Sequence, residues 1–529
     1  MSSMIHTKFW KFLREKLGKN KSLDLLVLIA GLLTPLGFSP FGFWPIPIIT
    51  LAVLLFSLDH QPISPMRALC RGFLFGLGFF GVGISWVYIS IHEYGSVNIF
   101  LSLLITSCFI FYLALYPALT CYAYQKFFKP NLLLKTLFIF PAFWVISELL
   151  RSYLFTGFPW LDLGYAGINS PYAGMAPLWG VYGVSLCLLI AASLISLVFR
   201  TKGPKILIYL LVLILLTLFV QIIKNKSWTE ISSKPVSMAL IQGNISPNLK
   251  WNEGEELQII QTYYQLTQSQ LEQNKNIDLI IWPEDALPLF KSSAEPFLTL
   301  LNKDALTHHS SILLGLPIDQ PNLNNPDNAL AYNGALILGE GQGQYLKRHL
   351  VPFGEYTPDF FSNLTNLLNL PMSDFSKGPE NQNLLQLQNI NLNSKQNSKP
   401  TPVSLGLTIC YESAFPLEFQ KNMQGADLLI SISDDAWFGR SLGAWQHLEM
   451  AQMRAKETGR YLIQDTNSGM TVIISPQGQI LKFLTPYQAG ILNGQVYAMK
   501  NQTPWMQAGI YPLLLLIFLM IAVTYCNRK

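Results

Sequence analysis

Four side chains in the second half of the sequence are of the types that nucleophilic chemistry needs. Cys410 ends the apolar run VSLGLTIC, Glu284 follows the run IDLIIWP, and Lys347 and Glu355 stand on either side of the turn in KRHLVPFGE. A thiolate is the nucleophilic form of cysteine, and a carboxylate can take up its proton and later return it. An ammonium group can stabilise the thiolate and then a developing oxyanion. Together they predict covalent catalysis by cysteine, although Cys410 could also be a small buried hydrophobe and each charge a solvated surface residue.

Short runs rich in Val, Ile and Leu recur between about residues 228 and 503, each bounded by Gly, Pro or Asn. Such runs favour buried β-strands over helices. Helical patterns intervene at about 254–274 and 444–458, so we expect an α/β layered domain. Reactive groups in such domains gather where strands end, which is where Cys410, Glu284 and Lys347 stand. The expected strands are 236–243, 277–284, 311–317, 331–339, 403–410, 427–433 and 471–476.

Three further segments of this region carry a local prediction. GEGQGQ at 339–344 is expected to be a hairpin turn, because it lacks the strand-to-helix context and the GK[ST] of a phosphate-binding loop. The Asn- and Gln-rich stretch 379–400 is expected to be a surface loop or a hairpin extension. The apolar segment 357–376 has two interpretations, which are ordinary core packing and an arm resting on a membrane beside an active site.

The composition excludes several classes of protein. Hydrophobic residues make up 50% of the 529 residues, and charged residues make up 13%, against roughly 25% in an ordinary soluble domain. A wholly soluble globule, a disordered chain and a collagen-like fibre are therefore excluded. The net charge of +5 is small for this length and argues against a nucleic-acid binder. The six cysteines contain no CxxC pair and are too few for a disulfide scaffold; all except Cys410 lie in or beside apolar runs, where they are expected to be apolar filler.

Eight apolar runs are candidates for membrane spans, because a helix of about 20 apolar residues crosses the hydrocarbon core. They are about 22–37, 42–58, 69–91, 98–124, 132–150, 174–199, 205–223 and 508–526. The first two could instead form one re-entrant hairpin, and the first 40 residues could be a cleaved signal peptide. The runs that follow favour a retained first helix.

Basic residues alternate from loop to loop. Lys and Arg gather before the first run, after every second run and at the chain end, while 92–97 has none and 151–173 has only Arg151. Because cytoplasmic loops collect Lys and Arg, both termini should be cytoplasmic and the polar domain should lie outside. The predicted organisation is a basic N-terminus (1–21), a seven-span membrane domain (22–224), a periplasmic catalytic domain (225–505) and a C-terminal span with a short tail (506–529).

Few ionisable residues occur near the spans. Glu148, Arg151 and Asp162 lie at or just beyond the end of the fifth run, whereas a transporter more often shows such groups at mid-membrane. The seven histidines show no metal spacing, and His349 and His447 stand alone, so a hydrogen-bonded structural role is expected for each. No metal or cofactor is expected.

At the catalytic candidates the sequence resembles a known family. The motifs WPE (282–284), KRHLVPFGEYTP (347–358) and ICYESAFP (409–416) resemble the nitrilase, or carbon–nitrogen hydrolase, superfamily and its Glu-Lys-Cys triad. Three further blocks match in order: IQGNISPNLKW (241–251), DDAWFG (434–439) and MRAKETGRYLIQDTNSG (453–469). With the predicted spans, essentially the whole chain resembles the membrane-bound acyltransferase branch of that superfamily.

The resemblance implies an αββα sandwich behind the membrane domain, and it assigns roles to individual residues. Cys410 matches the nucleophile, Glu284 the general base and acid, and Lys347 the lysine that stabilises the oxyanion. Glu355 matches a glutamate that supports the triad. Three more positions match supporting residues of the active site: Tyr411, Glu412 and Trp251. Asp434 departs from the pattern, because Asn is expected there, and it is given no catalytic role.

The same resemblance implies a two-step reaction in a bacterial inner membrane. Cys410 would accept the sn-1 acyl chain of a phospholipid, commonly phosphatidylethanolamine, as a thioester, and the α-amino group of the S-diacylglyceryl cysteine of an apolipoprotein would then receive it. Water must be kept from the thioester, or transfer becomes hydrolysis. Two alternatives remain, which are a membrane-tethered amidase acting on a small substrate and a transporter or sensor with an inactive domain.

Overall fold

The computed structural model describes residues 20–95, 97–127, 131–250, 254–274, 276–322, 329–357, 374–388 and 402–527. Within these residues the chain forms two compact units. The helical unit consists of the residues up to Tyr88, Ile99–Lys226 and the residues from Ile510 onward. The α/β unit consists of Ile89–Asn98 and Ser227–Gly509.

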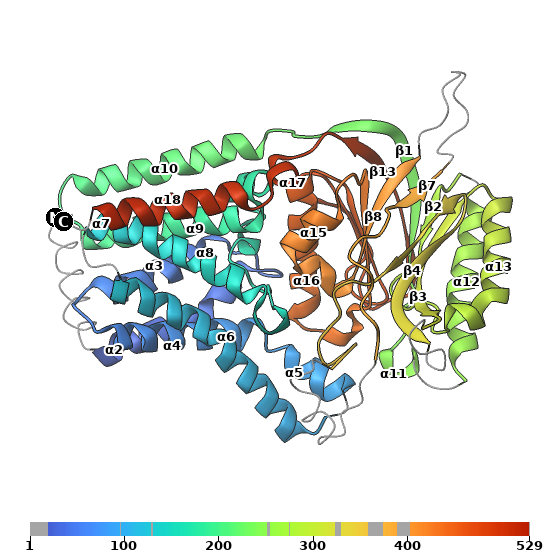
Figure 1. The fold of residues 1–529 in the computed structure, drawn as a ribbon, viewed down its shortest axis with the longest axis horizontal. Helices are drawn as coiled ribbons and strands as arrows, with labels where there is room; N and C mark the ends of the chain where they lie inside the picture. Colours follow the sequence, from blue (N-terminus) through green and yellow to red (C-terminus); the bar gives the residue numbers. More distant parts are fainter. Residues whose placement is uncertain are drawn as a thin grey trace. The chain divides into compact units, whose positions relative to one another are not determined.

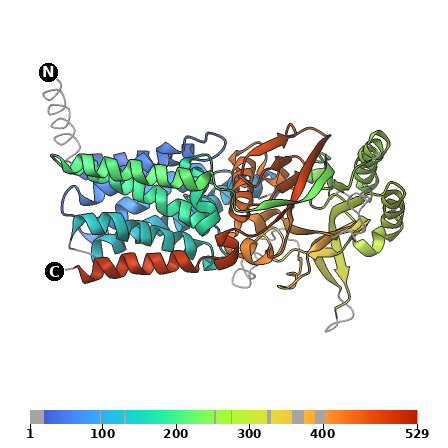
Figure 2. The same cartoon turned by 90° about the horizontal axis from the view of Figure 1, so that it is seen from above.

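Apolar helices lie side by side in the helical unit (Figures 1 and 2). They are α2 (Asn20–Leu33), α3 (Pro45–Asp59), α4 (Pro65–Gly83), α6 (Ile99–Phe127), α7 (Leu132–Leu134) continuing through η3 (Lys135–Ile139) into α8 (Phe140–Arg151), α9 (Ala176–Arg200), α10 (Lys205–Lys224) and α18 (Tyr511–Cys526). Proline occupies the first turn of α3, α4 and α18, where it removes no intrahelical hydrogen bond.

Five described segments are long and apolar enough to cross a membrane: Pro65–Gly83, Ile99–Phe127, Leu132–Arg151, Pro171–Arg200 and Lys205–Lys224. Two more predicted spans form shorter apolar helices, α3 and α18, and the first predicted run contains α2. All eight runs thus contain helix, while eight crossings stays a prediction. The third run was placed at 69–91, but α4 ends at Gly83, and the residues from Ile89 to Asn98 belong to the α/β unit.

The surface of α10 shows what surrounds the helical unit. Leu207 is 69% exposed and Ile222 is 72% exposed, and apolar side chains cover most of the helix between them. Apolar surface left in water costs about 25 cal/mol per Å², whereas the same surface is at no disadvantage in lipid. The helical unit is therefore membrane-embedded.

The ionisable residues at the end of the fifth run pair with one another. Arg151 Nη2 lies 2.6 Å from Asp162 Oδ1, and Glu148 Oε1 accepts a hydrogen bond of 2.8 Å from the backbone N–H of Leu163. Glu148, Arg151 and Asp162 are all buried. These contacts give the three charges a structural role in tying α8 to the loop that follows it.

Two β-sheets pack face to face in the α/β unit (Figure 1). The first has the order β13-β1-β2-β3-β4-β6: β13 (Gly490–Lys500), β1 (Glu230–Gln242), β2 (Leu279–Ile281), β3 (Ser311–Gln320), β4 (Leu330–Gly339) and β6 (Gln344–Leu346). The second has the order β12-β11-β10-β9-β8-β7-β5: β12 (Ile480–Phe483), β11 (Val472–Ile474), β10 (Leu462–Thr466), β9 (Leu428–Ser433), β8 (Val403–Ile409), β7 (Leu385–Leu387) and β5 (Gly341–Gln342).

The alternation of side chains along each strand divides the core into layers. Leu279 and Ile281 of β2 join Leu405 and Leu407 of β8 in a cluster between the two sheets, while Ile280 points to the opposite face. On that outer face lie α12 (Glu256–Gln273) and α13 (Lys291–Thr307). The helices α15 (Pro416–Asn422) and α16 (Leu442–Thr458) lie beside the second sheet (Figure 1). The arrangement is an αββα sandwich, which confirms the expected fold class.

The local predictions for this unit have mixed outcomes. Every predicted strand contains a strand, and both predicted helices are present. The segment 339–344 is a hairpin turn as predicted, since β4 and β6 pair antiparallel on either side of it, and its tip, β5, pairs with β7 of the other sheet. Residues 358–373 of the predicted arm and 389–401 of the polar stretch lie outside the described residues. Strands β7, β10, β12 and β13 and helices α11 (Pro247–Lys250), α13, α15 and α17 (Pro504–Ala508) were not predicted. Strand β7 lies within 379–400, and its Leu385 and Leu387 are buried in the core, so this part of the stretch is not a surface loop.

Candidate active site

Three strand ends carry the predicted triad. Glu284 follows β2, Lys347 follows β6 and Cys410 follows β8. The turn that carries Glu284 is anchored by Trp282, which is fully buried, stacks on Tyr263 and donates a hydrogen bond of 2.9 Å to the hydroxyl of Thr267 in α12. The sequence WPE therefore aligns Glu284 through packing of its own tryptophan.

A glycine lets the neighbouring strand pass under this turn. A Cβ atom at Gly315 of β3 would lie 2.5 Å from the carbonyl oxygen of Pro283 and 2.8 Å from the backbone nitrogen of Asp285. Real Cβ atoms do not approach backbone atoms so closely. Gly315 is thus required for the position of Glu284.

Cys410 stands at a sharp strand-to-helix turn. Its φ is +52°, in the left-handed region that L-residues rarely adopt, and it is the first residue of the 3-10 helix η8 (Cys410–Ala414). Its side chain is partly exposed. A nucleophile held in a costly backbone conformation points to a functional requirement at that position.

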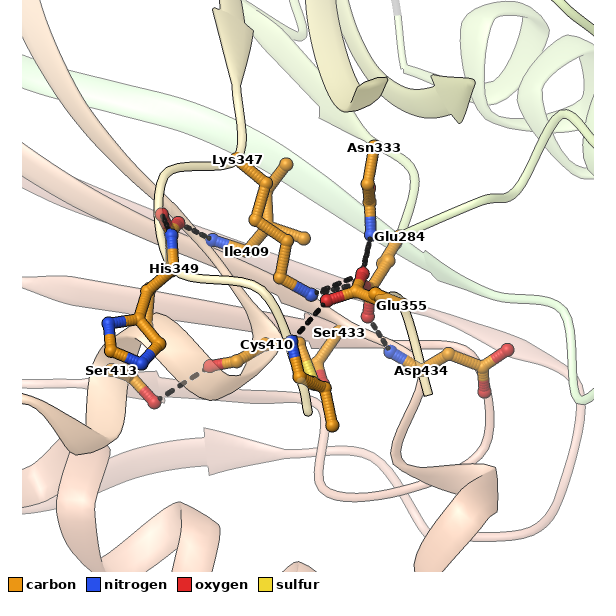
Figure 3. A network of polar contacts seen from close by, with 12 residues as sticks. Glu284, Asn333, Lys347, His349, Glu355, Ile409, Cys410, Ser413, Ser433 and Asp434 are labelled. Atoms are coloured by element: carbon orange, nitrogen blue, oxygen red, sulfur yellow. Dashed lines mark hydrogen bonds and ion pairs between the residues drawn. The ribbon is translucent and has the colours of Figure 1, made fainter. Parts of the chain in front are cut away.

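Lys347 binds two carboxylates at once (Figure 3). Its Nζ lies 3.0 Å from Glu284 Oε1 and 2.8 Å from Glu355 Oε1. The side-chain amide of Asn333 donates to the same two oxygens, at 2.7 and 2.6 Å. Cys410 lies beside this group in the same view. The tertiary structure thus brings Glu284, Lys347, Glu355 and Cys410 together, as the sequence predicted.

Asn333 was missed by the sequence analysis. It lies on β4, whose register with β6 places it next to Lys347. The backbone carbonyl oxygen of Asn333 accepts a hydrogen bond of 2.9 Å from the backbone N–H of Lys347. A single Asn within a predicted strand does not indicate a functional site in the sequence, because only strand pairing shows which residue it faces. The side-chain amide of Asn333 keeps the two carboxylate oxygens near Lys347.

The charges of the site give each group a defined proton state. Burial alone would raise the pKa of Glu284, but the ammonium group of Lys347 and three hydrogen bonds outweigh it and lower that pKa. Burial opposes the charge of Lys347, while the two glutamates raise its pKa well above the usual value. Burial and the Glu284 charge raise the pKa of the Cys410 thiol, against the opposing effect of Lys347. The resting site therefore holds a carboxylate, an ammonium and a neutral thiol, so the thiol needs a base.

Glu412 and Tyr411 are not part of this cluster. The carboxylate of Glu412 accepts hydrogen bonds from the hydroxyl of Tyr345 and from the backbone N–H groups of Ile409 and Arg348. Tyr411 is 9% exposed and its ring packs against Phe415 at 4.9 Å between centroids. Both side chains hold the loops that carry Cys410 and Lys347. Trp251 lies outside the described residues.

Asp434, at the position where Asn was expected, contacts Glu284 through its backbone and Lys250 through its carboxylate. Its N–H donates a hydrogen bond of 2.8 Å to Glu284 Oε2, which any residue at this position could do. Its carboxylate forms a buried ion pair with Lys250, with Oδ2 and Nζ 2.5 Å apart, and Asn467 donates to its other oxygen. The negative charge at 434 is thus matched by a lysine from the segment before α12.

A short segment from the first half of the sequence reaches the same loop. The hydroxyl of Ser90 donates a hydrogen bond of 2.8 Å to the carbonyl oxygen of Trp437, and the Tyr94 ring packs edge-on against the Trp437 ring at 5.7 Å. The sequence analysis counted these residues as the end of a span and an outside loop. Nothing in their local pattern indicates contact with residues 434–438, which are hundreds of positions away.

Comparison with known proteins assigns both parts of the chain. Residues 30–194 match the model of the apolipoprotein N-acyltransferase N-terminal domain, and residues 237–500 match that of the carbon–nitrogen hydrolase domain. An apolipoprotein N-acyltransferase of Coxiella burnetii is 40% identical over 509 residues, covering 95% of this chain and 99% of that protein. The protein of that name from Azotobacter vinelandii is 38% identical, covering 96% of this chain and 95% of its own length.

A solved structure is similar to about half of this chain. Saccharomyces cerevisiae Nit3, a member of branch 10 of the nitrilase superfamily, aligns with a TM-score of 0.36 and 16% identity, over 51% of this chain and 92% of its own.

Proposed function

The chain belongs to the apolipoprotein N-acyltransferase family, and on that premise we propose that it moves a fatty acyl chain from a phospholipid to an apolipoprotein through a thioester on Cys410. The donor is the sn-1 ester of a phospholipid such as phosphatidylethanolamine. The acceptor is the α-amino group of the N-terminal S-diacylglyceryl cysteine. Lys347, bound to Glu284 and Glu355 beside Cys410, is the observation that carries this proposal.

In the first step Glu284 takes the proton of the Cys410 thiol as the sulfur attacks the ester carbonyl. The carbonyl oxygen becomes an oxyanion, which the ammonium group of Lys347 stabilises. The ester C–O bond then breaks, and the proton on Glu284 passes to the departing oxygen of the lysophospholipid. Cys410 is left as a thioester and Glu284 as a carboxylate.

In the second step the acceptor amine attacks the thioester carbonyl. Glu284 takes a proton from the attacking nitrogen, and Lys347 again lies beside the oxyanion. The C–S bond breaks, the proton on Glu284 returns to the thiolate, and the amide product leaves. The carboxylate, ammonium and thiol of the resting site are restored, so no other reactant is needed.

The charge arrangement supports these roles. The thiol is not ionised at rest, because burial and the neighbouring carboxylate raise its pKa. Glu284 is ionised, because Lys347 lowers its pKa, and it can therefore act as the base. Glu355 and Asn333 keep Lys347 and Glu284 in place.

Mass spectrometry of the full-length protein after exposure to phospholipid vesicles tests the proposal. The Cys410 peptide should gain the mass of one fatty acyl chain, and Cys410→Ala should abolish the gain. Cys526→Ala is the matched control, since this cysteine is exposed at the end of α18 and should leave acylation unchanged. Acyl transfer by Cys410→Ala would contradict the nucleophile assignment.

We also propose that the catalytic domain is periplasmic in a bacterial inner membrane and that both termini are cytoplasmic. The alternation of basic loops supports this orientation. In cells with a permeable outer membrane, an impermeant thiol reagent should label Glu380→Cys, and it should label Lys202→Cys only after the inner membrane is opened. The reverse pattern would overturn the orientation.

A further inference from the structure

Four buried polar side chains form a chain of hydrogen bonds that ends on the backbone of Cys410, and none of them takes part in the steps above. His447 of α16 contacts Asp435 Oδ1 through Nδ1 at 2.9 Å and the hydroxyl of Ser413 through Nε2 at 2.8 Å. The hydroxyl of Ser433, the last residue of β9, donates to the same Asp435 oxygen at 2.7 Å.

This set has the composition of a Ser-His-Asp triad, but it cannot act as one. Ser413 is 0% exposed, His447 is 1% exposed and Asp435 is 0% exposed. A nucleophile must reach the substrate, and the fully buried Ser413 does not face solvent. Ser413 and His447 instead contact the carbonyl oxygen of Cys410.

That carbonyl oxygen accepts a hydrogen bond of 3.1 Å from the hydroxyl of Ser413, which Figure 3 shows, and it lies 3.2 Å from Nε2 of His447. Cys410 has a φ of +52°, a conformation that costs a residue with a side chain of order 1 kcal/mol or more. Such a conformation persists only where its surroundings hold it. Strand β8 holds the peptide before Cys410, so fixing the carbonyl after it also fixes the rotation about the Cα–C bond and, with it, the direction of the Cα–Cβ bond.

The arrangement of donors and acceptors defines the protons. A serine hydroxyl has one hydrogen, so if Ser413 donates to the Cys410 carbonyl, it must accept from an N–H at Nε2 of His447. The carboxylate of Asp435 only accepts, so Nδ1 must carry a hydrogen as well. With the protons assigned in this way, His447 is an imidazolium ion paired with Asp435.

The surroundings of His447 agree with that charge. Burial favours the neutral ring, but the Asp435 carboxylate and its hydrogen bond outweigh it and raise the pKa of His447. Glu284 adds a smaller effect of the same sign. Neutral groups also face the ring: the Cys410 carbonyl and the Ser413 hydroxyl from η8, and the Phe438 ring from η9 (Asp435–Phe438).

We propose that His447, held as an imidazolium by Asp435, is a positioning residue that fixes the backbone of Cys410 and so aims its sulfur at the acyl carbonyl. The inference rests on the proposed function. It assigns a role in the reaction to Asp435, Ser413 and His447, which touch neither substrate nor the reacting atoms.

The test compares two reactions of Cys410 in the full-length protein. Acyl-enzyme formation from phospholipid needs an aligned sulfur, whereas alkylation by iodoacetamide, a small mobile reagent, does not. His447→Gln should slow acylation by about 10- to 100-fold, as misplacement of a reacting group does, and should change the alkylation rate less than threefold. His308→Gln, on the loop after α13, is the matched control and should change neither rate.

A second variant gives a readout that a purely structural role would not change. Asp435→Asn removes the charge that keeps His447 protonated. The alkaline limb of the acylation rate, where activity falls as pH rises, should therefore move to lower pH by at least one unit relative to the wild type. Ser413→Ala, which removes only a hydroxyl, should slow acylation without moving that limb.

The outcomes separate this inference from the proposed function. Equal losses of acylation and alkylation, or acylation by His447→Gln within twofold of wild type, would overturn the positioning role. An unmoved alkaline limb in Asp435→Asn would overturn the imidazolium. A wild type that forms no acyl-enzyme would overturn the proposed function and this inference with it.

Discussion

Glu412 accepts a hydrogen bond of 2.7 Å from the backbone N–H of Arg348. One residue lies two positions after the nucleophile and the other directly follows the lysine of the site, so this contact joins the two loops that carry the triad. The same carboxylate also binds the N–H of Ile409 and the hydroxyl of Tyr345. Glu412 therefore acts on the site through backbone geometry.

Replacing Glu412 tests that role. Glu412→Ala leaves buried N–H and O–H donors without an acceptor, and each unsatisfied donor typically costs about 1–3 kcal/mol. We expect a lower free energy of unfolding and a loss of acylation together. Thermal and denaturant unfolding of the purified protein measure the first effect. Glu380→Ala, a change of an exposed glutamate, is the control; if both variants unfolded alike, the structural role of Glu412 would be refuted.

Lys347→Met should affect both rate and pH dependence. Loss of one oxyanion donor typically slows a reaction about 10²–10³-fold. Lys347 also keeps the pKa of Glu284 low, and without it that pKa should rise. The acidic limb of acyl-enzyme formation, where the base becomes protonated, should then move to higher pH. Lys291→Met, which removes a lysine away from Glu284 and Cys410, is the control. An acidic limb that does not move in Lys347→Met would show that Lys347 does not set the charge of Glu284.

Lys347 also links pH to stability. Because the folded pKa of Glu284 lies below its unfolded value, this group stabilises the fold above the unfolded pKa, and the effect is lost as pH falls through the folded pKa. In Lys347→Met, the free energy of unfolding should not show this decrease at low pH. Unfolding measured between pH 3 and 7 compares the two proteins.

Asp285 should make the opposite contribution. Burial and the charge of Glu284 raise the pKa of this acid to about 7. The folded state therefore holds a proton that the unfolded state releases near pH 4, and Asp285 makes the protein less stable as pH rises between those values. Asp285→Asn should remove this slope and stabilise the protein by up to about 4 kcal/mol at pH 8, since one pKa unit corresponds to about 1.4 kcal/mol.

Unfolding curves at pH 5 and pH 8 check the prediction for Asp285. The variant should gain about 1.5 kcal/mol at pH 5, roughly one pH unit above the unfolded pKa, and most at pH 8. An equal gain at both values would mean that the carboxyl is not protonated in the folded protein. Asp319→Asn, near the end of β3, is the control, because hydrogen bonds with Ser292 and other groups outweigh desolvation and lower the pKa of Asp319.

Gly315→Ala should displace Glu284 by pushing on the backbone of the turn that carries it. The new methyl group would meet the backbone of Pro283 and Asp285, and overpacking of this kind costs typically about 1–3 kcal/mol. We expect slower acylation and a lower free energy of unfolding. Gly81→Ala is the control, because a Cβ atom there has no neighbour within 4 Å. Wild-type acylation by Gly315→Ala would show that the turn tolerates the shift.

Local patterns in the sequence predicted the elements and their chemistry. Apolar runs located the membrane helices, short runs rich in Val, Ile and Leu located seven of the strands, and the motifs at 284, 347 and 410 predicted a cysteine-based site. These signals are short-range, because side-chain periodicity depends only on neighbouring residues. The sequence also indicated that His447 would be hydrogen-bonded, although not to what.

Only the tertiary structure decided which distant side chains meet. Asn333 faces Lys347 through strand register, His447 reaches Cys410 across the boundary between a helix and a strand end, and Ser90 contacts Trp437 from another part of the chain. Each of these pairings depends on how sheets and helices pack, and packing joins residues whose separation in the sequence carries no periodic signal. The sequence by itself predicted the candidate reacting groups, and the packed fold determined the contacts that hold them.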